Sequence, residues 1–158
     1  MVVTPATRLP RSRAKSISVI EGMPETVARA PVHPAHPERG VRELRAGPGI
    51  PVFVGREDLP KEAGKVRLKD LCNIDYADGK MKYAGNDLSI LKNGVPIIHW
   101  APSNAVEAEV LMTDGTSKKG LAEPGLASAK DKVVQLERFA FVRVEATAPG
   151  IRCVFSHR

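Results

Sequence analysis

Apolar and polar side chains alternate with a period near two along Lys132–Val144, a segment close to the carboxyl end of the chain. The apolar members are Val134, Leu136, Phe139, Phe141 and Val144, and the polar members are Gln135, Arg138 and Arg143. Alternate residues of an extended chain point to opposite faces. The segment therefore predicts a barrel strand that packs one face against a core and offers Gln135 and Arg138 to a partner.

A second alternating segment is Lys65–Leu71. One side of it carries Val66 and Leu68, and the other carries Lys65, Arg67 and Lys69. Three cations on one strand face repel one another unless an anion lies across them, so this face favours an anionic partner. A solvated edge strand that is protected by its charge is the alternative.

Short runs rich in β-branched residues, separated by Gly, Pro, Asp and Asn, predict the remaining strands. These runs lie at 16–20, 26–32, 41–44, 52–54, 95–100, 106–112 and 151–155. Asp78-Gly79 and Asn93-Gly94 are hairpin-turn signals, and the stretch between them, Lys80–Leu91, predicts strand, turn and strand. The 13 Pro and 13 Gly leave few uninterrupted helical stretches, so the chain favours small β-barrels over helical bundles.

Composition narrows the class of protein. The 158 residues suffice for one medium domain or two small ones, and the net charge of +6 favours an anionic partner such as nucleic acid. No apolar run is long enough for a membrane helix, and no secretory signal is evident. Two distant cysteines predict buried thiols in a reducing, cytoplasmic compartment. Residues 1–15 are interpreted as a basic arm or as a boundary segment outside the native domain.

Candidate chemistry is sparse. His33 and His36 are close in sequence, but no third ligand accompanies them, so we expect no metal site. His99 lies in an apolar strand beside Trp100 and is interpreted as structural. Neither a phosphate-binding P-loop nor a G-x-S-x-G nucleophile elbow is present. We therefore expect no catalytic residue, and the chain favours a binding module over an independent hydrolase.

Several motifs, in their order and spacing, resemble those of one family. They are 30–40, 64–71, the "G-x-I-H-W"-like 94–101, 106–110, the "G-x-A-E-P-x-L"-like 120–126, and 134–141, which is similar to "x-Q-F-E-R-x-G-Y/F". This pattern resembles the C-terminal anticodon-binding region of the archaeal and eukaryotic type of glutamyl-tRNA synthetase, which the glutaminyl enzyme shares. The resemblance covers 17–158. Ala140 and Glu145 depart from it, standing where relatives usually have glycine and aspartate.

The resemblance implies an all-β fold of two small, closed or partly open antiparallel β-barrels packed side by side. They would occupy 16–158, with a distal barrel at roughly 60–100 from which the chain returns to the first barrel. The anticodon loop of tRNA would be gripped where the barrels meet. The chain would be a fragment of a class I glutamate–tRNA ligase whose catalytic domain, which uses ATP and magnesium, is absent. No cofactor is expected in the fragment itself.

The resemblance also implies roles for individual residues. Relatives read the middle anticodon base with the residues equivalent to Gln135 and Arg138, and that base is uridine for both glutamate and glutamine. Gln and Arg can satisfy the acceptors and the donor of an unstacked uridine. Lys61 is the nearest equivalent of the residue that reads the third base. Arg67 and Lys69 occupy positions that contact the anticodon arm, and Lys65 adds charge beside them.

The expected partner is therefore tRNA(Glu), with neither DNA nor a membrane involved. Two alternatives stay open. The chain could come from a glutaminyl-type or non-discriminating synthetase, a choice that depends on the third anticodon base. It could also be a scaffold module that binds other synthetases in a multi-enzyme complex.

Overall fold

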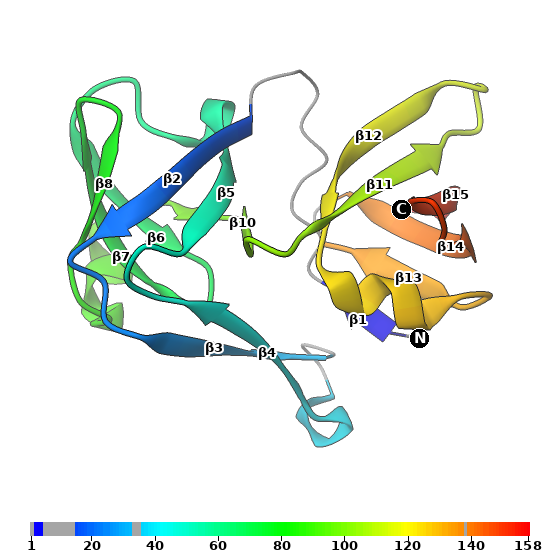
Figure 1. The fold of residues 1–158 in the computed structure, drawn as a ribbon, viewed down its shortest axis with the longest axis horizontal. Helices are drawn as coiled ribbons and strands as arrows, with labels where there is room; N and C mark the ends of the chain where they lie inside the picture. Colours follow the sequence, from blue (N-terminus) through cyan, green and yellow to red (C-terminus); the bar gives the residue numbers. More distant parts are fainter. Residues whose placement is uncertain (1, 5–14, 33–35, 138) are drawn as a thin grey trace. The chain divides into compact units, whose positions relative to one another are not determined.

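The computed structural model describes residues 2–4, 15–32, 36–137 and 139–158. The described chain is built from strands joined by turns and short 3-10 helices, which confirms the expected all-β class (Figure 1). It divides into two units. The central unit comprises 14–30 and 41–103, and the C-terminal unit comprises 104–158 with 31–40 and the first residues of the chain.

The central unit contains a seven-stranded sheet of order β10-β5-β2-β8-β7-β6-β9. In chain order its strands are β2 (Lys15–Glu21), β5 (Pro51–Gly55), β6 (Gly64–Leu68), β7 (Cys72–Ala77), β8 (Lys80–Tyr83), β9 (Ile97–Ile98) and β10 (Trp100–Ala101). The two edge strands, β9 and β10, are separated along the chain by His99 alone. The opposite edges of the sheet therefore meet there, and the sheet is nearly closed into a barrel.

Most neighbouring strands of this sheet are antiparallel, while β2–β8 and β6–β9 are parallel. Its core is filled by alternate side chains of the strands. The largest fully buried ones are Ile20, Val52, Val54, Val66, Leu68, Leu71, Ile74 and Met81. Trp100 closes the barrel from the last strand, and its indole Nε1–H donates to the carbonyl of Lys69 at 2.9 Å. A buried indole thus has the hydrogen-bond partner that it requires.

Two further strands of the central region, β3 (Thr26–Pro31) and β4 (Val41–Ala46), form a separate two-stranded sheet. Two 3-10 helices, η1 (Pro37–Arg39) and η2 (Arg56–Asp58), follow β3 and β5 along the chain. These short elements connect strands and bury no residue of their own.

The C-terminal unit contains a six-stranded, partly curled sheet of order β1-β13-β14-β15-β11-β12. Its strands are β1 (Val2–Thr4), β11 (Val106–Leu111), β12 (Ser117–Ala122), β13 (Val133–Leu136), β14 (Ala140–Ala146) and β15 (Ile151–His157). Aliphatic side chains fill its core, among them Val110, Leu126, Val134, Leu136, Val142 and Val144. Leu126 comes from a 3-10 helix, η4 (Pro124–Ala129).

The strand predictions are largely confirmed, since 16–20, 41–44, 52–54 and 151–155 fall on observed strands, and 26–32 and 106–112 do so except at their last residue. The single strand expected at 95–100 is wrong, because residues 95 and 96 lie outside strands and His99 separates β9 from β10. Asp78-Gly79 forms the expected hairpin turn between β7 and β8, with φ of 52° and 75° at the two residues. Positive φ at both central residues is typical of the turn that matches strand twist.

The strand–turn–strand prediction for Lys80–Leu91 is wrong in its second half. The chain there forms a 3-10 helix, η3 (Leu88–Asn93), because the Asp87 side chain accepts a hydrogen bond from the Ser89 backbone N–H at 2.9 Å. That side-chain cap offers the backbone an alternative to a strand ladder. Gly94, at φ 74°, ends this helix instead of turning a hairpin.

The expected division of the chain, with a distal barrel at roughly 60–100 packed beside the first, stays a prediction. Val2–Thr4 forms β1, which pairs in parallel with β13, within the segment interpreted as a basic arm. The arginines of that segment, Arg8, Arg11 and Arg13, lie outside the described residues.

We expect Ile74→Ala to lower the free energy of unfolding by about 2–5 kcal/mol, because Ile74 is 0% exposed in the central core and its removal leaves a cavity. Ile17→Ala is the matched control, since Ile17 is 63% exposed and its loss should cost at most about 1 kcal/mol. Urea unfolding followed by fluorescence of the single tryptophan, Trp100, measures both. Equal losses in the two variants would contradict the buried position of Ile74.

Candidate nucleic-acid interface

Gln135 lies on the outward face of β13. Its neighbours Val134 and Leu136 are 0% and 1% exposed in the core, whereas Gln135 itself is partly exposed. Because successive strand residues point to opposite faces, burial of these two neighbours directs the Gln135 amide away from the core. The alternation expected around this residue is therefore confirmed.

The expectation of one continuous strand over Lys132–Val144 is wrong. β13 ends at Leu136, β14 begins at Ala140, and the two strands pair antiparallel with Leu136 opposite Ala140. The turn between them resets the alternation, so Phe141 lies opposite Gln135 instead of joining Leu136 in the core. Arg138 falls between the strands in sequence and lies outside the described residues, so its placement stays a prediction.

Phe139 anchors the end of this hairpin. Its ring packs partly buried against the C-terminal core, and its backbone N–H donates to the Leu136 carbonyl at 3.0 Å. The ammonium of Lys118, from β12, lies 5.2 Å from the centre of the Phe139 ring, within the range of a cation–π contact. A cation is thus held close to the residue that follows Arg138.

A row of three side chains crosses the outward face of this sheet. Gln135 of β13 lies opposite Phe141 of β14, which lies opposite His157 of β15. The Phe141 and His157 rings are stacked, with centres 4.5 Å apart and planes 10° apart. Sequence analysis missed His157 because a register shift between Phe141 and Val142 decides which residue of β15 faces Phe141.

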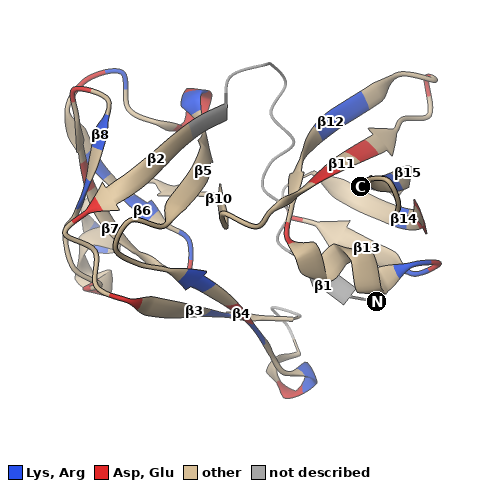
Figure 2. Ribbon diagram, in the orientation of Figure 1, with Lys and Arg blue, Asp and Glu red and all other residues tan. Residues whose placement is uncertain are grey.

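In the central unit, Lys65 lies on the outward face of β6 and forms an ion pair with Asp75 of β7. Both side chains are more than half exposed. Figure 2 shows Lys and Arg along β6 and along β12. The anion that lies across Lys65 in the structure is therefore a carboxylate of the neighbouring strand, and the charge of Lys65 is already partly balanced.

Arg67 corrects the expectation of three cations exposed on one strand face, because it is only 7% exposed. Its guanidinium donates to the Asn73 amide oxygen at 2.8 Å, and the Asn73 amide donates to the Asp87 carbonyl at 2.8 Å. Backbone hydrogen bonds of Asn73 with Ala84 and Gly85 bring the segment after β8 over this pair. The alternation of residues along β6 could not predict this burial, because the segment that covers Arg67 is distant in the sequence.

The other two predicted cations differ from Arg67 in exposure. Lys69 follows β6, is partly exposed, and its backbone accepts the Trp100 indole N–H and donates to the Ile98 carbonyl at 3.0 Å. Lys61 is exposed in the segment between η2 and β6. The proposed RNA contacts of Lys61, Lys65, Arg67 and Lys69 stay predictions, as do those of Gln135 and Arg138.

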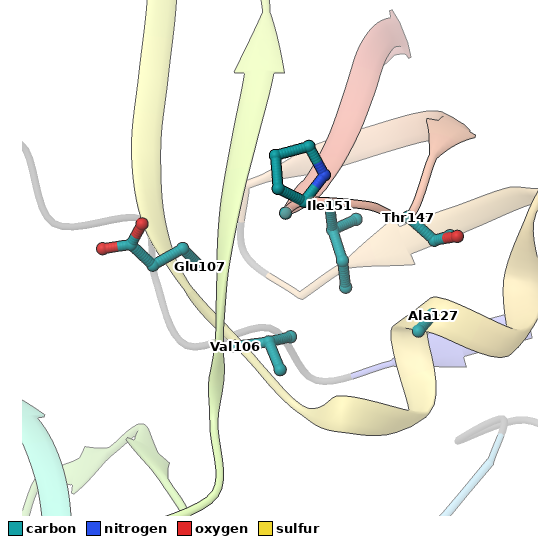
Figure 3. A pocket seen from close by; sticks show the side chains of 7 residues that line it. Val106, Glu107, Ala127, Thr147 and Ile151 are labelled. Carbon is teal, nitrogen blue, oxygen red and sulfur yellow. The ribbon is translucent and has the colours of Figure 1, made fainter.

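Two hollows lie on the C-terminal unit, and neither includes Gln135. One of about 340 Å³ is lined by Val106, Glu107, Ala127, Thr147, Pro149, Gly150 and Ile151. Figure 3 shows the carboxylate of Glu107 directed away from Val106 and Ile151. The other, of about 310 Å³, lies along the outward faces of β11, β14 and β15 and includes Glu109 and Arg152.

No group of three or more metal-ligating side chains occurs in the part of the chain that the structure describes. His36 pairs with Glu38 at 2.9 Å, and His99 is buried in the central barrel, as expected. His33 lies outside the described residues. Of the helices that the structure describes, none has the length and apolar character needed to cross a membrane.

Both cysteines are buried and free, as the sequence predicts. Burial raises the pKa of the Cys72 thiol from 9.0 to about 11, against the opposing charge of Arg67, and raises the pKa of Cys153 to about 11. A thiol needs its thiolate form to react. These two side chains are therefore unreactive near neutral pH.

Comparison with known proteins gives consistent matches. A family model described as tRNA synthetases class I (E and Q), anti-codon binding domain, matches residues 14–92, and a second model of the same description matches 97–145. The chain is 40% identical over 150 residues to the glutamate–tRNA ligase of Pyrococcus abyssi and 38% identical over 146 residues to that of Methanosarcina acetivorans. Each alignment covers 88% of this chain but only 26% and 25% of the two relatives. The chain thus spans about a quarter of the length of these relatives.

We expect Arg67→Ala to lower the free energy of unfolding by about 1–3 kcal/mol, because it leaves the buried Asn73 amide oxygen without its donor. Lys65→Ala removes an exposed ion pair and should cost less than about 1 kcal/mol. Urea unfolding monitored by Trp100 fluorescence compares the two variants. A loss in Arg67→Ala no larger than that in Lys65→Ala would show that the guanidinium is not needed for folding.

We also expect the chain to lose stability between pH 9 and about pH 11. The raised pKa values mean that the unfolded thiols ionise first, so the stabilising contribution is full below pH 9 and disappears as pH rises toward about 11. The double variant Cys72→Ala/Cys153→Ala controls for lysine and tyrosine ionisation, which it shares with the natural chain. Urea midpoints that fall equally in both proteins over this range would contradict the expectation.

Proposed function

The chain belongs to the anticodon-binding domain family of the class I tRNA synthetases for glutamate and glutamine, and from that membership we propose that it binds the anticodon loop of tRNA(Glu) during aminoacylation. The outward position of Gln135 in β13 supports the outer face of the C-terminal sheet as the surface that contacts the loop. The names of the archaeal relatives favour glutamate as the amino acid.

Gln135 and Arg138 recognise the middle base of the anticodon in this proposal. An unstacked uridine presents O2 and O4 as acceptors and N3–H as a donor. The Gln135 amide oxygen accepts from N3–H while its NH₂ group and the Arg138 guanidinium donate to the two carbonyl oxygens. Single-stranded loops are the part of an RNA whose base edges are open to such side chains.

Lys61, Lys65 and Lys69 contribute affinity by neutralising phosphates of the anticodon arm. Contacts of this kind position an RNA and set its salt dependence, whereas base contacts set specificity. Arg67 also supports the lysines through the fold, because its guanidinium is buried against Asn73. It holds β6, β7 and the segment after β8 in the arrangement that displays Lys65 and Lys69.

The chain spans about a quarter of the length of these relatives. In this proposal it contributes anticodon recognition, while the ligation reaction with ATP and magnesium takes place outside it. A glutaminyl-type or non-discriminating synthetase is the second candidate, favoured by the family description, which covers both amino acids. The two candidates share a middle uridine and differ in the third anticodon base.

We expect Arg138→Ala to weaken binding of tRNA(Glu) by about 1–3 kcal/mol, mostly through lost preference for the correct middle base. Filter binding of transcripts with each of the four middle bases measures this preference. Arg29→Ala is the matched control, because Arg29 is an exposed cation that pairs with Glu43 at 3.3 Å and has no assigned RNA contact. Equal losses on all four transcripts would reduce Arg138 to an ionic contact and refute its role in base recognition.

A further inference from the structure

The stacked Phe141 and His157 rings occupy the same outward row as Gln135, one and two strands away from it. Adjacent strands lie about 4.8 Å apart, which agrees with the 4.5 Å between the ring centres. The rings thus stand side by side on the sheet with their faces parallel. One face of His157 is covered by Phe141, and the other is directed along the row, away from Gln135.

That second face of His157 is open in the part of the chain that the structure describes. The next strand in the sheet is β11, which ends at Leu111, and Leu111 pairs with Val154. β15 continues for three residues beyond that pair, so no residue of β11 lies opposite His157. The His157 side chain is exposed, while Phe141 beside it is partly buried.

Two π faces in an open stack, next to an amide that points outward, fit an unpaired nucleobase. Base–aromatic stacking tolerates any base, since every base has a π face. Exposed Arg143, two residues from Phe141 on the same face and 4.0 Å from the Asp131 carboxylate, supplies positive charge for a flanking phosphate. A purely apolar partner would leave the amide and the positive charge without contacts, and an acidic protein would leave the two rings without a base to stack.

Building on the proposed function, we propose that His157, supported by Phe141, stacks a second unpaired base of the anticodon loop, adjacent to the uridine that Gln135 reads. The pair extends the binding face by one nucleotide beyond the Gln135 and Arg138 position. Its contribution is affinity without base preference, because a stacked ring presents no hydrogen-bond pattern to the base edge. Gln135 selects the base, and the Phe141–His157 pair holds its neighbour in place.

The test uses the present chain and RNA stem-loops that carry the anticodon loop of tRNA(Glu), with an abasic nucleotide placed in turn at each loop position. His157→Ala should weaken binding of the complete stem-loop about fivefold or more. At one abasic position, and only there, the variant and the natural chain should bind alike, because the base that His157 would stack is already missing.

Two substitutions at the same position separate stacking from charge. His157→Phe keeps the ring without the ring nitrogens and should retain binding, whereas His157→Lys keeps a cation without a ring and should behave like His157→Ala. Leu111→Ala is the control on the neighbouring strand, where the side chain is 44% exposed and has no proposed RNA contact. Circular dichroism verifies that each variant keeps its strands.

The outcomes distinguish this inference from the proposed function. A natural chain that binds no stem-loop, or that shows no preference for the middle uridine, overturns the proposed function. A natural chain that prefers the uridine, together with a His157→Ala variant that binds equally well, overturns the stacking role alone. The same holds if His157→Ala weakens every abasic RNA to the same extent, since the loss would then not come from a base.

Discussion

The central unit depends on the short stretch that pairs with both edges of its sheet. Ile97–Ile98 lies along β6 and Trp100–Ala101 lies along β5, so five residues close the barrel. The Trp100 indole stabilises the closed barrel by donating a hydrogen bond to the Lys69 carbonyl. Because β6 is held between β7 and β9, its side chains from Lys65 to Leu68, and Lys69 directly after it, have different environments.

Two cations of β6, Lys65 and Arg67, have different environments. Lys65 stays in solvent beside Asp75, while Arg67 is covered and hydrogen-bonded to Asn73. A buried guanidinium is costly unless its donors are satisfied, so Arg67 contributes to the shape of the unit. The exposed lysines can exchange their surroundings for phosphate at much lower cost, which suits them to RNA binding.

The C-terminal unit presents its candidate site by alternation along β13 and β14 and by a register shift in the pairing of β14 with β15. Small side chains such as Val134, Val142 and Val144 fill one side of the sheet, and this leaves Gln135, Phe141 and His157 on the other. An amide for hydrogen bonding and two rings for stacking then occupy one row on three adjacent strands. The proposed function thus separates base selection by Gln135 from the affinity that the two rings contribute.

The sequence by itself determined the all-β class, most strands, the Asp78-Gly79 turn, the buried cysteines, the family, and the outward direction of Gln135. These follow from local alternation, turn chemistry and motif order, which act within a few residues. Tertiary structure alone decided that Arg67 is buried and that Phe141 stacks on His157. Each of these depends on which distant strand or loop lies opposite, and strand register is set by pairing between segments that are far apart in the chain.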